Sequence, residues 1–192
     1  MESTNPESVG LSGTRLKRVT SWLNGLVDDE KLAGASVLIG RHGKVAYFES
    51  AGVMDLETDQ EFNRDTVVRI YSMTKAVTTV AAMMLYEEGC FQLDDPVSKY
   101  IPAFGASRVW AGGDSPLEKT SPQVSPMLVR HLLTHTSGLT YGFMHTTPVD
   151  AAYRDARIDF PGQGGTLEQL VDRLASVPLL CQPGSQWNYS VS

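Results

Sequence analysis

Ser72 and Lys75 are the residues of this chain whose types and spacing most clearly suggest chemistry. They stand three residues apart at the start of a long apolar segment, residues 72–88, whose pattern predicts a helix. Because positions i and i+3 share one face of a helix, the hydroxyl and the amine can meet. Such a pair can give a serine nucleophile a base without a histidine. The spacing alone is weak evidence, because chance supplies about one such pair in a chain of this length.

The first third of the chain contains the elements that would lead into this pair. Apolar residues recur at helical spacing over residues 12–30, and Ser12 is suited to be the N-cap. Two β-rich runs, residues 34–40 and 45–48, flank a short turn and predict a hairpin. Residues 66–70 are expected to form a third strand.

The segment that follows, residues 72–88, is apolar nearly all round, which is typical of a helix buried at the centre of a fold. Gly89 is suited to end that helix. Three more helices are predicted farther on, over residues 127–135, 150–157 and 166–175. The first would open at Ser125 and Pro126, and the last has a capping box at Thr166. Strand signals therefore lie only in the first third, so the sheet would lack cover on one face and one edge.

Composition narrows the class of protein. The chain has 192 residues, a formal net charge of −6 and 42% hydrophobic residues, which suits one globular core. The mild acidity argues against nucleic acid as a partner. The polar start of the chain shows no secretory signal, and no apolar stretch is long enough for a membrane span, so we expect a cytoplasmic protein. Cys90 and Cys181 are expected to be reduced thiols.

Several motifs occur in order along the chain. They lie at residues 34–44, 71–75, 93–102, 132–139 and 183–190. Together they resemble the serine β-lactamase and penicillin-binding superfamily, in particular its esterase branch. That branch contains the class C β-lactamase-like carboxylesterases (family VIII) and related acyltransferases. The order of several motifs is much more specific than the Ser72–Lys75 spacing alone.

The resemblance implies an α/β (α+β) fold of the β-lactamase/transpeptidase type. This fold has a mixed antiparallel sheet with flanking helices and an all-helical domain. Residues 1–91 would be the N-terminal part of the sheet domain with the nucleophile helix, and residues 92–192 would be the helical domain. The active site would lie in the cleft between the two domains.

The resemblance also implies roles for three residues. Ser72 would be the nucleophile that forms an acyl-enzyme, and its backbone N–H would be half of an oxyanion hole. Lys75 and Tyr189 would move the proton, and the sequence leaves open which of them is the primary base. No metal or organic cofactor is implied. The expected reaction is hydrolysis of a small carboxylic ester, or transfer of its acyl group.

One departure from the family pattern concerns the substrate. β-Lactamases and peptidases usually have Tyr-x-Asn in the second motif, whereas this chain has Tyr189, Ser190 and Val191. Valine cannot hydrogen-bond a substrate amide, which favours esters over penicillins and peptides. Tyr141 and Phe143 are candidates to line the acyl pocket together with Val191, although ordinary core packing is an equal alternative.

A second departure concerns length. Family members continue for nearly as long again after the second motif, with further strands and a third motif. The chain therefore resembles the N-terminal half of such an enzyme, with an incomplete sheet, and a C-terminal fragment of the same enzyme is an expected partner.

Alternatives remain. A β-lactamase or D-Ala-D-Ala peptidase, an acyltransferase, and a non-catalytic truncated fragment are all compatible with the sequence. His131 and His135 have a spacing that can suggest a metal site, but Leu132 stands where the zincin motif has glutamate. We therefore expect no metal, and expect His135 to hydrogen-bond the backbone of residues 136–138.

Overall fold

The structure is a computed structural model that describes residues 2–158 and 165–192. The chain forms two compact units, Met1–Tyr71 and Ser72–Ser192, called unit 1 and unit 2 below. The helix that was predicted to carry the nucleophile belongs to unit 2 of this chain. The division into domains after residue 91 stays a prediction about the family fold.

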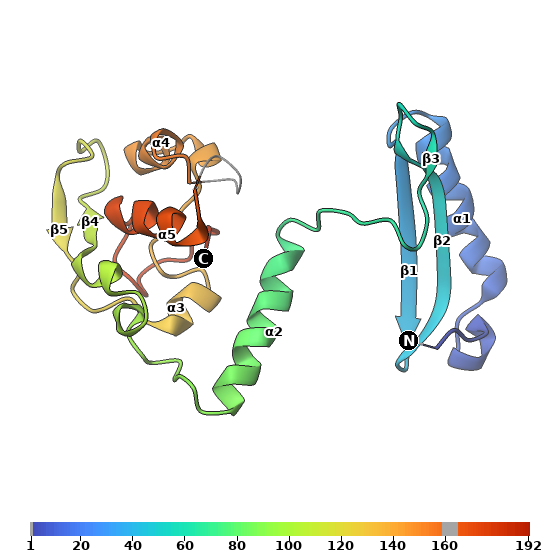
Figure 1. Ribbon diagram of the computed structural model, residues 1–192, viewed down its shortest axis with the longest axis horizontal. Helices are drawn as coiled ribbons and strands as arrows, with labels where there is room; N and C mark the ends of the chain where they lie inside the picture. Colours follow the sequence, from blue (N-terminus) through green and yellow to red (C-terminus); the bar gives the residue numbers. More distant parts are fainter. Residues whose placement is uncertain (1, 159–164) are drawn as a thin grey trace. The chain divides into compact units, whose positions relative to one another are not determined.

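Unit 1 is a helix on a small antiparallel sheet (Figure 1). Its elements are η1 (Pro6–Val9), α1 (Gly13–Asp28), β1 (Gly34–Arg41), β2 (Lys44–Asp55) and β3 (Gln60–Glu61). The strand order is β1-β2-β3, which confirms the predicted hairpin. The hydroxyl of Ser12 caps α1 by accepting a hydrogen bond from the Arg15 backbone N–H, and Leu23 is the buried residue of that helix.

The predicted third strand at residues 66–70 is wrong. The third strand is β3, which pairs with the end of β2 after a tight turn. Residues 66–70 pair with no strand of the part of the chain that the structure describes, and the Val67 side chain is 91% exposed. β-Propensity expresses how well a side chain fits a paired, half-buried surface, so a β-rich run without a partner need not form a strand.

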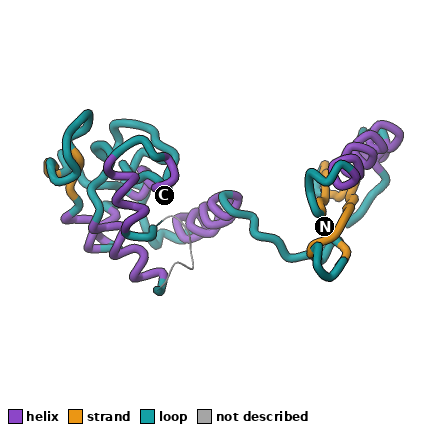
Figure 2. Tube along the Cα trace, turned by 90° about the horizontal axis from the view of Figure 1, so that it is seen from above, coloured by secondary structure: helices purple, strands orange, loops and turns teal. Residues whose placement is uncertain are grey.

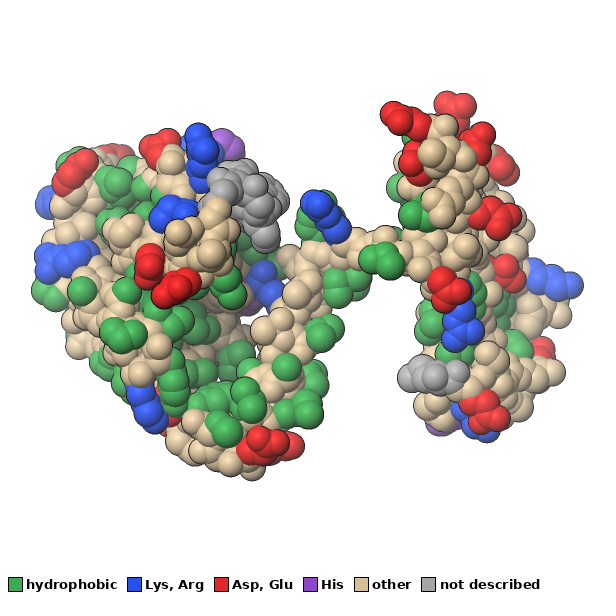
Figure 3. All heavy atoms as spheres, in the orientation of Figure 1, with side chains coloured by type: hydrophobic (Ala, Val, Ile, Leu, Met, Phe, Trp, Pro, Cys, Tyr) green, Lys and Arg blue, Asp and Glu red, His purple; other side chains and the backbone are tan. Residues whose placement is uncertain are grey.

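Helix α2 (Met73–Glu87) forms as predicted, with Ser72 as N-cap and Gly89 just beyond its end at φ 76°. Its predicted burial is not observed: none of its residues is buried. The other elements of unit 2 do not surround this helix. Apolar side chains gather along α2 in Figure 3. The largest exposed ones are Met73, Val77, Val80, Met84 and Leu85.

Unit 2 is built from short helices and loops, with one small two-stranded sheet (Figure 2). After α2 its elements are η2 (Val97–Lys99), η3 (Pro102–Ala106), β4 (Arg108–Trp110), β5 (Thr120–Pro122), α3 (Val129–Leu133), η4 (Gly142–Met144), α4 (Pro148–Asp155) and α5 (Leu167–Ser176). Strands β4 and β5 are antiparallel and were not predicted. Each has three residues, which is too short for an alternating pattern to be recognised.

Helix α3 is shorter than predicted and begins at Val129, four residues after Ser125. Long-range pairing holds the preceding backbone extended. The Val97 N–H donates to the Met127 carbonyl at 2.8 Å, and Leu128 forms a β-bridge with Pro96. Helices α4 and α5 form with their caps, including the predicted capping box at Thr166.

Two apolar clusters form the core of unit 2. One contains Val97, Phe104, Val109, Met127, Leu139 and Leu179, and the other contains Trp110, Val149, Tyr153, Ile158 and Val177. Val191 packs against both clusters. The end of the chain is therefore held by apolar contacts to the same core that supports α4 and α5.

The two cysteines are free thiols, as predicted. Cys90 is exposed, whereas Cys181 is buried, and this burial raises the pKa of its thiol. Among the described residues, no helix is long and apolar enough to cross a bilayer.

Candidate active site

The nucleophile candidate, Ser72, is the N-cap residue of α2. Ser72 has helical backbone angles, φ −65° and ψ −15°, and its carbonyl accepts a hydrogen bond from the Lys75 N–H at 3.1 Å. Its side chain makes no capping hydrogen bond and is exposed. The hydroxyl is therefore not used to cap the helix, a common role for a serine at this position.

Lys75 points toward two phenol rings from the first turn of the same helix. Its Nζ donates a hydrogen bond to the Tyr141 hydroxyl at 2.8 Å. The same nitrogen lies 5.2 Å from the ring centroid of Tyr189 and 5.4 Å from that of Tyr141. These distances are within the range of a cation–π contact, so both rings stabilise the amine at this position.

The two phenol rings beside the amine belong to a cluster of aromatic side chains. The rings of Tyr141 and Tyr189 have centroids 5.8 Å apart, and Phe143 stacks on Tyr141 at 4.6 Å. On the other side, the imidazole of His135 lies 4.7 Å from the ring of Tyr189. The structure thus brings together Lys75, Tyr189, Tyr141 and Phe143, four of the six predicted site residues.

Backbone pairing explains why residues so distant in sequence meet here. The Asn188 N–H donates to the His135 carbonyl at 2.8 Å, and the Asn188 side-chain amide donates to the Leu139 carbonyl at 2.9 Å. The Val191 N–H donates to the Thr140 carbonyl at 3.4 Å. The last residues of the chain therefore run alongside the loop that carries Tyr141.

The loop that carries Tyr141 is also held by contacts with Cys181 and helix α4. Gly138 has φ 87° and approaches the backbone so closely that an added Cβ would overlap the Cys181 carbonyl oxygen. The Thr140 hydroxyl donates to the fully buried Asp150 carboxylate at 2.9 Å. Arg154 donates to the Gly142 carbonyl. Helix α4 thus fixes the loop on both sides of Tyr141.

His135 makes contacts other than the predicted one, and no contact was predicted for His131. His135 does not bond residues 136–138; its Nδ1 lies 3.3 Å from the Ser190 backbone N–H, which donates to it. Burial and the positive charge of Lys75 lower the pKa of His135. In His131 the Nδ1 accepts a hydrogen bond from the Leu128 N–H at 3.1 Å, and burial and Arg130 lower its pKa.

Val191 differs from the other pocket candidates. Its side chain is half-buried and packs against the two core clusters, so the structure gives it a packing role. Phe143 is 47% exposed, as expected for a residue at the edge of a site. Contact of Val191, Phe143 or Tyr141 with a substrate stays a prediction.

The sequence reasoning did not identify Tyr141 as the partner of Lys75 or His135 as the neighbour of Tyr189. Both pairs are separated by more than fifty residues, and only folding brings them together. The one available signal was that His135 and Tyr141 stand close to each other in the strongest motif, residues 132–139, or just after it.

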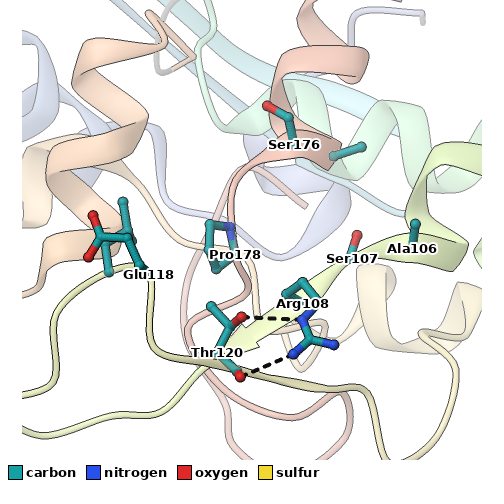
Figure 4. A pocket seen from close by; sticks show the side chains of 9 residues that line it. Ala106, Ser107, Arg108, Glu118, Thr120, Ser176 and Pro178 are labelled. Carbon is teal, nitrogen blue, oxygen red and sulfur yellow. Dashed lines mark hydrogen bonds between the residues drawn. The ribbon is translucent and has the colours of Figure 1, made fainter.

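A separate hollow of unit 2 lies between β4, the loop before β5 and the end of α5 (Figure 4). There Arg108 donates two hydrogen bonds to Thr120, one to the hydroxyl and one to the carbonyl. None of the residues that line this hollow belongs to the predicted site. Across residues 2–158 and 165–192, no three His, Cys, Asp or Glu side chains are grouped as metal ligands.

Comparison with known proteins defines the class. Residues 19–192 match the Beta-lactamase family, so the chain belongs to that family. Protein Rv1367c of Mycobacterium tuberculosis (strain ATCC 25618 / H37Rv) is 38% identical over 83% of this chain and 38% of its own length. Esterase EstB of Burkholderia gladioli is 31% identical over 99% of this chain and 46% of its own length.

Solved structures agree with this assignment. EstCE1, described as a hydrolase with promiscuous acyltransferase activity, superposes with a TM-score of 0.75 at 35% identity, over 91% of this chain and 43% of its own. A class C beta-lactamase has a TM-score of 0.64 at 20% identity over 94% of this chain and 42% of its own, which supports the fold alone. The predicted family and fold class are confirmed. The chain spans less than half the length of each of these relatives.

Proposed function

We propose that this chain carries the nucleophile and proton-transfer residues of a serine hydrolase that acts on small carboxylic esters. The observation that supports this most is the convergence on Lys75. Its Nζ is hydrogen-bonded to Tyr141 at 2.8 Å and faces the ring of Tyr189 at 5.2 Å, one helical turn from Ser72. Relatives named as esterases and acyltransferases point to the same chemistry.

The proposed reaction has two acyl-transfer steps. Ser72 Oγ gives its proton to Lys75 as a neutral amine or to Tyr189 as a tyrosinate and attacks the ester carbonyl carbon, which forms a tetrahedral oxyanion. When this collapses, the C–O bond to the alcohol breaks and the alcohol leaves with that proton. Water then attacks the acyl-Ser72 carbonyl by the same route, releases a carboxylic acid and returns the proton to Ser72 Oγ. The Ser72 backbone N–H is proposed to donate to the oxyanion.

Esters are the preferred substrate class in this proposal. The side chain of Val191 has no polar atom and packs into the core, so it offers no hydrogen bond to the amide of a penicillin or a peptide. Rapid hydrolysis of a chromogenic cephalosporin would favour a β-lactamase or peptidase instead. Product analysis with added alcohols would identify acyl transfer, which the names of several relatives make the second candidate.

We also propose that full activity needs a C-terminal portion of the same enzyme. The chain spans 46% of the length of Esterase EstB and 41% of lovastatin esterase from Penicillium rubens. If adding that portion does not raise activity, this part of the proposal is wrong. The cytoplasmic location stays a prediction.

The decisive experiment compares p-nitrophenyl butyrate hydrolysis by the natural protein that contains this sequence with its Ser72→Ala variant. We expect the variant to lose at least about 10³-fold in kcat, because the nucleophile is removed. Ser21→Ala, which alters an exposed serine of α1, is the matched control and should leave the rate unchanged. Equal activity in the Ser72→Ala variant and the parent would refute the proposal. A protein without turnover would instead favour the non-catalytic alternative.

A further inference from the structure

We propose that His135 is a positioning residue for Tyr189: its neutral imidazole and its backbone hold the segment Trp187–Ser190 so that the phenol faces Lys75. This inference rests on the proposed function, because it concerns the geometry of the same proton-transfer pair. It adds a residue to which neither the motif pattern nor the comparisons assign a role.

The contacts of His135 involve four consecutive residues around Tyr189. Its carbonyl accepts the Asn188 N–H at 2.8 Å, and its Nδ1 accepts the Ser190 N–H at 3.3 Å. Its ring lies 4.7 Å from the ring of Tyr189 and makes an edge contact with Trp187 at 6.4 Å. Backbone bonds on both sides of Tyr189 and a tilted ring beside its own together restrict where the phenol can lie.

One of these contacts, the hydrogen bond to Nδ1, requires the imidazole to be neutral. Because Nδ1 accepts a backbone N–H, its proton must be on Nε2, and a second proton on Nδ1 would face the Ser190 N–H. The groups that face the ring are Lys75 from α2 and Tyr189 and the Ser190 hydroxyl from the end of the chain. Burial lowers the pKa of His135, and the cation of Lys75 lowers it further because it opposes a second positive charge here.

The backbone conformation of His135 allows variants that separate the effect of the hydrogen-bond acceptor at Nδ1 from the effect of the ring. Its φ is 55°, a conformation that asparagine tolerates better than most residues. His135→Asn can place an amide oxygen near the position of Nδ1 and cannot be protonated at neutral or mildly acidic pH. His135→Ala removes both the acceptor and the ring.

The first test measures kcat and KM for p-nitrophenyl butyrate in the natural protein, with rates divided by the number of acylating sites from burst titration. We expect His135→Ala to lower kcat by about tenfold or more with KM changed less than about threefold, because a displaced Tyr189 impairs proton transfer rather than binding. His135→Asn should recover most of the rate. An unchanged kcat per site in His135→Ala, with only a lower melting temperature, would overturn the proposal.

The second test does not depend on turnover. The imidazole of His135 is titrated by NMR in the parent and in Lys75→Met, with His131 in the same spectra as the internal control. We expect a midpoint below 6.5 in the parent and a higher one in Lys75→Met, since a facing cation has been removed. A midpoint that does not respond to Lys75→Met, or responds no more than that of His131, would overturn this inference. Failure of the Ser72→Ala comparison would instead overturn the proposed function.

Discussion

Asp150 is the carboxylate that ties the Tyr141 loop to helix α4. It is fully buried and accepts hydrogen bonds from Thr140 through one oxygen and from Thr146 and Thr147 through the other. A buried carboxylate with this many donors is stabilising only while all of them are satisfied. Its place in the site is therefore indirect, through the loop that it anchors.

Asp150→Asn should destabilise the protein by about 3 kcal/mol, because an amide NH₂ would face donors and leave buried groups without partners. Urea unfolding measures the change. Asp155→Asn is the matched control, since Asp155 is an exposed residue of the same helix, and should cost less than about 0.5 kcal/mol. Similar losses in the two variants would contradict the role given to Asp150.

At the same scale, the sequence could supply candidate site residues but not the contacts between them. Ser72, Lys75 and Tyr189 could be proposed because the family motifs are local patterns, and their catalytic roles stay a prediction. The bond between Lys75 and Tyr141 joins residues 66 positions apart, and no local pattern in a single chain encodes such a distance. Val191 was assigned to the substrate from its chemistry alone, whereas its packing depends on two clusters formed by distant residues.

At the scale of elements, Gly138 determines whether the motif at residues 132–139 can adopt the loop conformation that it has in the structure. Gly138→Ala should cost about 3 kcal/mol, from a left-handed φ of 87° together with a clash against the Cys181 carbonyl. Gly112→Ala separates the two effects, because φ is 80° there but nothing lies near an added Cβ. We expect about 1 kcal/mol for Gly112→Ala by urea unfolding. Equal costs would show that the clash at Gly138 is relieved by movement of its neighbours.

The elements that could be predicted are those whose signals are local. Helices α1 and α5 formed with the expected caps, because Ser12 and Thr166 bond N–H groups within the next turn. The start of α3 could not be predicted, because Met127 and Leu128 pair with a segment thirty residues earlier. Strand formation depends even more on partners, which explains the missed β4 and β5 and the wrong strand at residues 66–70.

On the scale of the whole molecule, His131 and His135 make stability depend on pH. Both have a folded-state pKa below the ordinary 6.5, so the unfolded chain binds more protons as pH falls through this region. The stability that the two histidines contribute is fully present above pH 6.5, and it is lost as pH falls through their folded-state pKa values. We expect the free energy of unfolding by urea to be lower at pH 5.5 than at pH 7.5.

The paired variant His131→Gln and His135→Asn tests this assignment, because neither replacement titrates in this range. We expect the difference in the free energy of unfolding between pH 5.5 and pH 7.5 to be smaller in this variant.

Asp95 affects stability in a different pH range. Hydrogen bonds from Tyr100, Gln92 and Lys99 lower its pKa to about 2 from 3.8. Its contribution is therefore present above pH 3.8 and unchanged between pH 5.5 and 7.5. A pH dependence that persists in full in the paired variant would mean that other groups cause it.

The two free thiols have a practical consequence. Cys90 is exposed and lies three residues beyond the end of α2. Cys181 lies buried against Gly138, and this burial raises the pKa of its thiol. A maleimide added to the native protein should therefore label Cys90 first, and Cys181 should react only when the packing beside the strongest motif opens. In a variant with Cys90 replaced by serine, the rate of maleimide labelling at Cys181 therefore measures how often the loop that positions Lys75 and Tyr189 opens.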